Sequence, residues 1–324
     1  MKKARKKMLK QLLKIIDIAF LGYFYLVRFL SFILPPRVLY AIYTGFSFVL
    51  YHVVPGTGKR CRRTIAEALP EIEDPERIKY IARRAYDELY KGMVDLVVFA
   101  RYGERIARDL EIEGLDIVER ELARVGSGVI CIAGHFGGWA IATGVMSYHG
   151  YLSTPIVVDP DTTPTPRLVR AVVNYGQKIK AADGAIFTGD DATRKTLELL
   201  KQPKKILVIT VDVMGSTILD LLGKPAAIAS GMGHFVIDSG VPMIPGFVLR
   251  KKGGPLKFQA IFREKVSYQI TGDRDKDIHA IQQAALDAAE KQIRLTPEQW
   301  TQWGAVERWW KRAEKLQKRS KGTR

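Results

Sequence analysis

The chain has 324 residues, of which 47% are hydrophobic and 26% are charged, so it is long enough to bury a sizeable core. This composition excludes a disordered tail protein, a collagen and a low-complexity array. Two cysteines, Cys61 and Cys131, are too few for a disulfide framework or a cysteine-rich metal site. The net charge of +17 makes the location of the basic residues informative.

Most of this net charge lies at the two ends of the chain. Residues 1–10 contain six Lys and Arg and no acid, and residues 308–324 contain eight basic residues and one acid. Between these ends the charges nearly balance. This distribution favours a protein held at an anionic lipid surface, and it argues against a nucleic-acid binder, which would need basic and aromatic residues together on one face of its body. The alternative is a pair of solubilising tails.

Two apolar stretches follow the first basic segment, at 15–34 and 38–54, and two prolines separate them. The first is long enough to span a bilayer, but it contains Asp17 and Arg28, which are costly in hydrocarbon. We therefore expect residues 1–54 to anchor the chain to a membrane, as one spanning helix or as a hairpin in the interface. A buried core helix is the alternative. The polybasic start predicts a cytoplasmic N-terminus, and no cleavage site for a secretory signal is present.

The rest of the chain predicts one α/β domain over residues 55–307, followed by a basic C-terminal tail at 308–324. Residues 55–110 have helical periodicity and form a lead-in. Short apolar runs then alternate with amphipathic stretches, which is typical of a mostly parallel central sheet flanked by helices. The expected strands are 129–133, 155–158, 185–188, 206–211 and 242–249, with an edge strand at 257–262, and the expected helices are 163–180, 190–202 and 226–239.

The most informative segment is Gly134–Ala140, directly after the first of these strands. His135 stands at the carboxyl end of that strand, where open α/β sheets place their chemistry, and it is a candidate general base. Gly137 and Gly138 allow close approach of the backbone, and their N–H groups are candidates for stabilising an oxyanion. A histidine beside glycines is also often a structural loop residue, so this segment alone leaves both interpretations open.

Several further segments complete a pattern that resembles the lipid A biosynthesis (lauroyl/myristoyl) acyltransferases of the lysophospholipid acyltransferase superfamily. The resemblance covers nearly the whole chain and depends on the order and spacing of its pieces. The pieces are the basic apolar N-terminus, Arg62–Pro70, Ile112–Leu115, the His135 segment, Val211-Asp212, Leu222–Ala226, Phe247–Arg250, and Thr296–Trp300 with the aromatic and basic ending at Trp309–Arg312.

The sequence departs from the family at one important position. The family pattern places a carboxylate five residues after the histidine, where it holds the imidazole in the correct tautomer, and here that position is Ala140. Three explanations are open: an engineered replacement of Glu or Asp, a natural chain that uses a distant acid (Asp159, Asp161 or Asp212), or a natural pseudoenzyme that only binds lipid. The intact surroundings of Ala140 favour the first.

The resemblance implies direct acyl transfer from an acyl thioester, either acyl-CoA or acyl carrier protein, to a hydroxyl of a glycolipid or lysophospholipid. It implies no metal and no redox cofactor, and it places the protein at the cytoplasmic face of the plasma (inner) membrane. Arg250, Arg167 and Arg170 are candidate contacts for an anionic donor or headgroup, and Asp212 matches a family position in the site. The sequence predicts no particular oligomeric state.

Other classes of protein fit less well. A serine hydrolase would need a Gly-x-Ser-x-Gly elbow after a strand, and a nucleotide-binding enzyme would need a phosphate-cradling glycine loop; the sequence contains neither in the required context. The remaining rival is a non-catalytic lipid-binding homologue of the same fold, which would share every feature except turnover.

Overall fold

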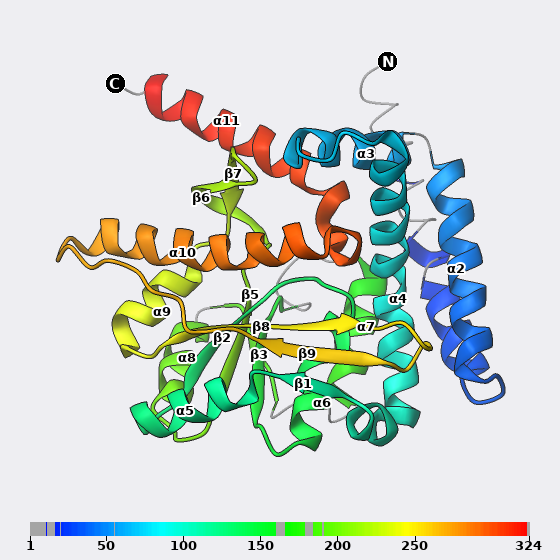
Figure 1. Ribbon diagram of the computed structural model, residues 1–324, viewed down its shortest axis with the longest axis horizontal. Helices are drawn as coiled ribbons and strands as arrows, with labels where there is room; N and C mark the ends of the chain where they lie inside the picture. Colours follow the sequence, from blue (N-terminus) through cyan, green and yellow to red (C-terminus); the bar gives the residue numbers. More distant parts are fainter. Residues whose placement is uncertain are drawn as a thin grey trace.

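The computed structural model describes residues 11, 17–19, 21–54, 56–159, 166–178, 184–189 and 191–322. Its centre is a seven-stranded sheet in the order β1-β9-β8-β2-β5-β3-β4 (Figure 1). Strands β8, β2, β5, β3 and β4 are parallel, and β9 reverses direction beside β8. These strands are β1 (Glu111–Glu113), β2 (Val129–Ala133), β3 (Ser153–Val157), β4 (Ile186–Phe187), β5 (Ile206–Thr210), β8 (Met243–Arg250) and β9 (Phe258–Phe262). The mostly parallel α/β fold expected from the sequence is confirmed.

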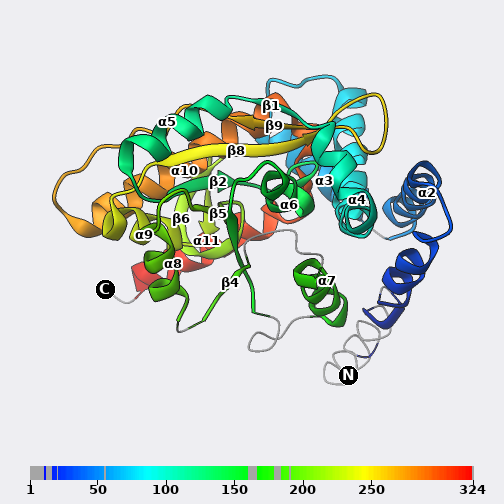
Figure 2. The same ribbon diagram turned by 90° about the horizontal axis from the view of Figure 1, so that it is seen from below.

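Helices cover both faces of this sheet, as the two views together show (Figure 2). The helices are α2 (Pro36–Val53), α3 (Thr57–Ala68), α4 (Pro75–Arg108), α5 (Leu115–Val125), α6 (Ala142–Tyr148), α7 (Arg167–Lys178), α8 (Ala192–Leu200), α9 (Gly231–Ser239), α10 (Arg274–Leu295) and α11 (Val306–Gly322). Short 3-10 helices are η1 (Trp139–Ile141), η2 (Pro297–Gln299) and η3 (Thr301–Gly304).

The alternation of side chains along β2 separates two hydrophobic cores. Ile130 and Ile132 point to the face covered by α8, α9 and α10, whereas Val129 and Cys131 point to the face covered by α2, α5 and α6. All four are buried, so the strand is apolar on both sides, as expected for a central parallel strand. Helix α4 joins the cores, because its first half packs in one and its second half in the other.

Helix α4 begins and ends where the sequence signals require. Pro75 occupies its first turn, and the Asp74 side chain caps it by accepting a hydrogen bond from the Glu76 N–H at 2.9 Å. Arg105 and Arg108 lie in the last turn, where positive charge is favourable. The helix is 34 residues long and therefore reaches from η2 and η3 at one end to α6 at the other.

The two charged residues of the first apolar stretch both contact α7. Asp17 accepts hydrogen bonds from the backbone N–H groups of Arg167 (2.8 Å) and Leu168 (3.2 Å), so it caps the start of α7. The Arg28 guanidinium lies over the Tyr175 ring at 4.9 Å. These contacts explain why an apolar segment retains an acid and a base. Among the described residues no single helix is long and apolar enough to span a bilayer, although α2 and α3 together, bent by 87°, pass that test by length and composition.

Three parts of the sequence prediction differ from the structure. Residues 226–228, expected to begin a helix, belong to β7 (Lys224–Ile228), which pairs with β6 (Met214–Leu221) in a separate antiparallel hairpin. The strand at 257–262 is not an edge strand, because β1 pairs with it on its outer side. The basic segment at 308–324, expected as a tail, is helical over its described part, and Trp309 and Trp310 are buried beside the hairpin.

Candidate active site

His135 and Asp212 meet at the carboxyl edge of the sheet. His135 lies two residues after β2, and Asp212 lies two residues after β5, which is the parallel neighbour of β2. Because parallel neighbours end at the same edge, residues 77 positions apart in sequence become adjacent. The His135 Nδ1 atom lies 2.8 Å from Asp212 Oδ1, and the His135 backbone N–H donates to Asp212 Oδ2 at 2.8 Å. Since a carboxylate only accepts, Nδ1 carries the proton and Nε2 is left as an acceptor.

The electrostatics of the pair follow from this contact. Burial of the imidazole lowers its pKa, but the Asp212 charge and hydrogen bond outweigh burial and raise the pKa of His135 above its usual value. Burial likewise raises the pKa of the Asp212 carboxyl, but the His135 contacts and the Trp300 hydrogen bond prevail, so the net shift is downward. Asp212 is only 2% exposed, whereas the His135 side chain is 21% exposed. The acid is therefore a buried anion, and the base is the member of the pair that solvent or substrate can reach.

A C-terminal segment closes the back of this pair. The Trp300 indole N–H donates to Asp212 Oδ2 at 2.8 Å, and Trp300 is fully buried. Phe136 and Trp300 form an isolated β-bridge, and the Thr301 N–H donates to the His135 carbonyl at 3.0 Å. In the sequence Trp300 belongs only to the segment Thr296–Trp300 of the family resemblance, and no local signal connects it to a histidine 165 positions earlier.

The loop after His135 is held by its own backbone hydrogen bonds. The Gly137 N–H donates to the Gln299 carbonyl at 3.0 Å, and the Gly138 N–H donates to the Val248 carbonyl at 2.9 Å. Both N–H groups therefore already have acceptors within the chain, so their role in stabilising an oxyanion stays a prediction that would require them to exchange partners. The glycines also serve close packing. A Cβ on Gly137, where φ is +39°, would lie 2.5 Å from Gln299 Oε1, and one on Gly138 would lie 2.8 Å from Val248.

Ala140 lies in η1, directly after the aromatic residue that contacts the histidine. The Trp139 ring meets the His135 ring edge to face, with centroids 4.9 Å apart. Its indole also lies against Gly92 of α4, where a Cβ would come within 3.0 Å of Trp139 Nε1. The acid position of the family pattern is thus filled by a methyl group, while the carboxylate that contacts His135 comes from the end of β5.

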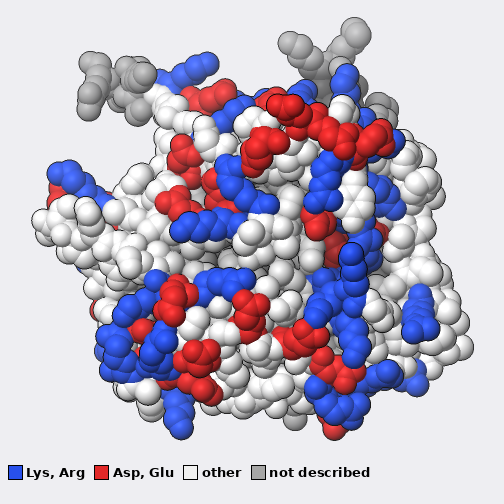
Figure 3. Space-filling model, viewed as in Figure 1, with Lys and Arg blue, Asp and Glu red and all other residues white. Residues whose placement is uncertain are grey.

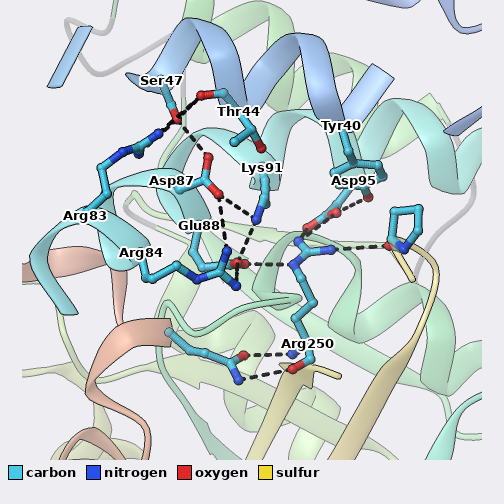
Figure 4. A network of polar contacts seen from close by, with 12 residues as sticks. Tyr40, Thr44, Ser47, Arg83, Arg84, Asp87, Glu88, Lys91, Asp95 and Arg250 are labelled. Carbon is cyan, nitrogen blue, oxygen red and sulfur yellow. Dashed lines mark hydrogen bonds and ion pairs between the residues drawn. The ribbon is translucent and has the colours of Figure 1, made fainter. Parts of the chain in front are cut away.

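Arg250 is committed to internal ion pairs. Its guanidinium contacts the carboxylates of Glu88 at 2.8 Å and Asp95 at 2.7 Å, and its side chain is 8% exposed (Figure 4). Burial acts against the charge, but these two acids raise the pKa of Arg250 well above its usual value. The hydrogen bonds described for its guanidinium are all to groups of the protein, namely Glu88, Asp95 and the Pro255 carbonyl, so a contact of Arg250 with an anionic substrate stays a prediction. Gln299 holds its backbone, accepting from the Arg250 N–H at 2.7 Å and donating to its carbonyl at 3.1 Å.

The same network continues along α4 toward α2. Lys91, itself 7% exposed, contacts Asp87 at 2.6 Å and Glu88 at 3.1 Å. Ser47 of α2 donates to Asp87 at 2.7 Å, and the Tyr40 hydroxyl donates to Asp95. Figure 4 shows these side chains directed toward one another from α2, α4 and the end of β8. The buried charges thus connect the N-terminal helices to the strand that supports the His135 loop.

The other candidate residues lie apart from the histidine. Arg167 and Arg170 are exposed on α7, and no contact between either side chain and His135 is found within the described ranges. Asp159 lies two residues after β3, and its backbone N–H donates to the Thr188 hydroxyl. Asp161 lies outside the described residues. Of the acids weighed from sequence, Asp212 is the one that the structure places against His135.

The remaining histidines have structural contacts. His52, His149 and His279 are each hydrogen-bonded to a backbone carbonyl, and His234 lies on α9. Over the part of the chain that the structure describes, no group of three or more His, Cys, Asp and Glu side chains is arranged to hold a metal ion.

The chain matches the model of a known family. The family model described as "Bacterial lipid A biosynthesis acyltransferase" matches residues 3–312, which include the N-terminal apolar stretches, the whole sheet and the first turns of α11. The curated proteins contain no sequence similar enough to count as a match.

Proposed function

The chain belongs to the family of bacterial lipid A biosynthesis acyltransferases, and we propose that it moves a fatty acyl chain from an acyl thioester to a hydroxyl of a membrane glycolipid with His135 as the general base. Because the chain belongs to this family, it is an acyltransferase of lipid biosynthesis. The donor is acyl-CoA or acyl carrier protein, and the acceptor class includes lysophospholipids. The observation that supports this proposal most directly is the 2.8 Å contact between His135 and Asp212 at the carboxyl edge of the sheet.

The proposed reaction uses the free nitrogen of the imidazole. His135 Nε2 takes the proton of the acceptor hydroxyl while its oxygen attacks the thioester carbonyl carbon. The tetrahedral intermediate then collapses by breaking the C–S bond, and the imidazolium returns the proton to the departing thiolate. Asp212 fixes the tautomer and stabilises the imidazolium while remaining ionised. Trp300 and the His135 N–H hold that carboxylate in place by donating to its second oxygen.

Within this proposal Ala140 does not disable the enzyme. The orienting carboxylate is supplied from the end of β5 rather than from η1, which is the second of the three explanations left open by the sequence. Asp212 is buried, ionised and directed at Nδ1, so it meets the chemical requirements of the missing acid. An engineered loss of the acid is therefore not needed to explain the sequence.

The site is proposed to work at the cytoplasmic face of the inner membrane. Large apolar side chains are exposed over residues 21–34 and along α2, including Phe29 (61%), Phe32 (69%) and Val53 (68%). Figure 3 shows this edge, on the right of the view, as mostly uncharged, whereas Lys and Arg are mixed with Asp and Glu over the rest of that face. An exposed apolar surface of this kind is typical of contact with lipid.

The direct test is an acyl-transfer assay. Purified chain is incubated with labelled acyl-CoA or acyl carrier protein and a panel of glycolipids and lysophospholipids, and products are identified by mass spectrometry. We expect the chain as written to form an acylated lipid and the His135→Ala variant to form none above background. If lipid binds but neither donor is consumed, the non-catalytic lipid-binding reading replaces this proposal.

Restoring an acid at position 140 should not raise kcat by a large factor. We expect the Ala140→Glu variant to have a kcat within about threefold of the parent, because the single Nδ1–H of His135 already donates to Asp212 and has no second hydrogen for another carboxylate. Steady-state turnover of the two proteins measures this. A gain of several orders of magnitude would show instead that the parent lacks its orienting acid.

The pH dependence of kcat/KM should reflect the raised pKa of His135. Only the neutral imidazole accepts the proton, so kcat/KM should fall as the pH falls through the pKa of His135. Because Asp212 raises this pKa above the ordinary value of 6.5, the midpoint of the acid limb should lie above 6.5. A pH profile of kcat/KM checks this, and a midpoint at or below the ordinary value would contradict it.

A further inference from the structure

One hydrogen bond leaves the imidazole of His135 partly free to move. Asp212 holds its Nδ1 atom at 2.8 Å, but a ring held at one nitrogen can still tilt and move its far side. The position of Nε2, the atom proposed to accept the proton, therefore needs a second restraint. Trp139 supplies a contact of this kind, because its ring lies against the imidazole with centroids 4.9 Å apart and an interplanar angle of 61°.

The Trp139 indole is itself held by packing rather than by a polar contact. Its N–H is buried and has no hydrogen-bond partner among the described residues. The indole lies instead against Gly92 of α4, where a Cβ would come within 3.0 Å of Trp139 Nε1 and within 3.1 Å of Cε2 and Cζ2. The place of the indole therefore depends on the absence of a side chain at position 92.

Strand β8 fixes both α4 and the η1 turn at this level. On α4, Glu88 and Asp95 lie about one turn to either side of Gly92. Both carboxylates pair with Arg250 at the end of β8, at 2.8 and 2.7 Å (Figure 4). The η1 turn is held to the same strand by the Gly138 N–H, which donates to a β8 carbonyl at 2.9 Å. Because helix and turn are both fixed, a group added at position 92 has to displace the indole.

We propose that Trp139 is a positioning residue of the acyl transfer and that Gly92 is the packing partner that places its indole against His135; this inference rests on the proposed function. In this role Trp139 does not touch the reacting atoms but defines where Nε2 lies. A methyl group at position 92 requires the indole to move by a few tenths of an ångström. Since a misplacement of about 1 Å can cost about 100-fold in rate, a shift of this size should cost about fivefold.

The first test adds that methyl group. We expect Gly92→Ala to lower kcat about fivefold and to change the KM for donor and acceptor by less than about twofold, because the shift acts on proton transfer. Gly103→Ala is the matched control on the same helix: a Cβ there would meet the rings of Phe99 and Tyr148 at 3.2 Å instead of the indole. It should keep the parental kcat. Both exchanges introduce a better helix former, so both proteins should remain folded, which thermal unfolding checks.

A smaller ring at position 139 tests whether the indole transmits the effect. Trp139→Phe removes the atoms that the added methyl group would meet. In the Trp139→Phe background we therefore expect Gly92→Ala to change kcat by less than about twofold, so the two substitutions are not additive. A fivefold loss in both backgrounds would overturn the proposal, because position 92 would then act without the indole.

The position of the imidazole can also be measured without turnover. The ring current of a nearby indole shifts the NMR signals of histidine ring protons, so histidine-labelled protein in detergent micelles reports the contact directly. The His135 signals, assigned with the His135→Gln variant, should move in Gly92→Ala and stay in place in Gly103→Ala. Unchanged His135 signals in Gly92→Ala would overturn the proposal even if kcat fell. Moved signals in a protein that transfers no acyl group would uphold the packing contact and overturn the proposed activity.

Discussion

Replacing Asp212 with asparagine should lower kcat by about 10³- to 10⁴-fold while the protein remains folded. The amide oxygen can still accept from Trp300 and from the His135 N–H, so the loop keeps its supports. The amide NH₂ group, however, donates where the carboxylate accepted, and it favours the tautomer with the proton on Nε2. That tautomer cannot accept a proton from the substrate hydroxyl. Turnover with the preferred donor and acceptor measures the loss, and circular dichroism with thermal unfolding checks the fold.

Asp159→Asn is the control for this prediction. Asp159 also follows a strand at the carboxyl edge and was one of the acids that the sequence left open, but the contact described for it joins its backbone N–H to the Thr188 hydroxyl and does not involve the histidine. We expect its kcat to stay within about twofold of the parent. Comparable losses in the two variants would mean that total negative charge at this edge, not the contact with Nδ1, supports catalysis.

The fold could be predicted because it depends on local patterns. Apolar runs alternating with helices identified the parallel sheet, and the position of His135 after a buried strand placed this residue at the carboxyl edge of that sheet. Its partner could not be assigned with the same reasoning. Asp212 is 77 residues away, and only the strand order, in which β5 lies directly beside β2, brings the carboxylate to Nδ1.

The sequence alone did not reveal which polar groups of Gly137, Gly138 and Arg250 have partners within the protein. Whether a glycine N–H or an arginine guanidinium is free for substrate depends on what packs against it, and here the partners are distant in sequence. Gln299 returns to accept from Gly137 and to hold the Arg250 backbone, while Glu88 and Asp95 come from a helix more than 150 positions before Arg250. A position at a strand end therefore indicated which edge of the sheet a residue lies at, but it did not reveal which polar groups already had hydrogen-bond partners.

The Arg250→Met variant should lose about 3–5 kcal/mol of the free energy of unfolding at neutral pH. The substitution leaves the Glu88 and Asp95 carboxylates, 1% and 0% exposed, buried without their guanidinium partner. Urea denaturation measures the loss. Arg120→Met is the matched control, because Arg120 pairs with Glu264 on the surface and its removal should change stability little.

Neutralising both acids should restore most of the free energy of unfolding that the Arg250→Met variant loses. In the Arg250→Met, Glu88→Gln, Asp95→Asn variant no unpaired charge is buried at this position, and replacing a buried ion pair by neutral groups is often close to neutral in stability. The triple variant also separates the two interpretations of Arg250. If Arg250 only supports the fold, the triple variant should regain near-parental KM values for donor and acceptor; a KM that stays high after stability has recovered would show that the guanidinium contacts substrate.

The pH dependence of the single variant provides a second check with a defined sign. In the parent, burial acts to raise the pKa of Glu88, but Arg250 and Lys91 prevail and lower it, so this carboxylate contributes stability above its unfolded pKa that is lost as the pH falls through the folded value. Without Arg250, burial dominates and the pKa moves upward, so the protonated acid becomes the stable buried form. The stability difference between parent and Arg250→Met should therefore shrink as the pH is lowered. A difference that stays constant with pH would mean that lost packing around Tyr40 and Phe258, whose rings the guanidinium covers, causes the destabilisation rather than the unpaired charge.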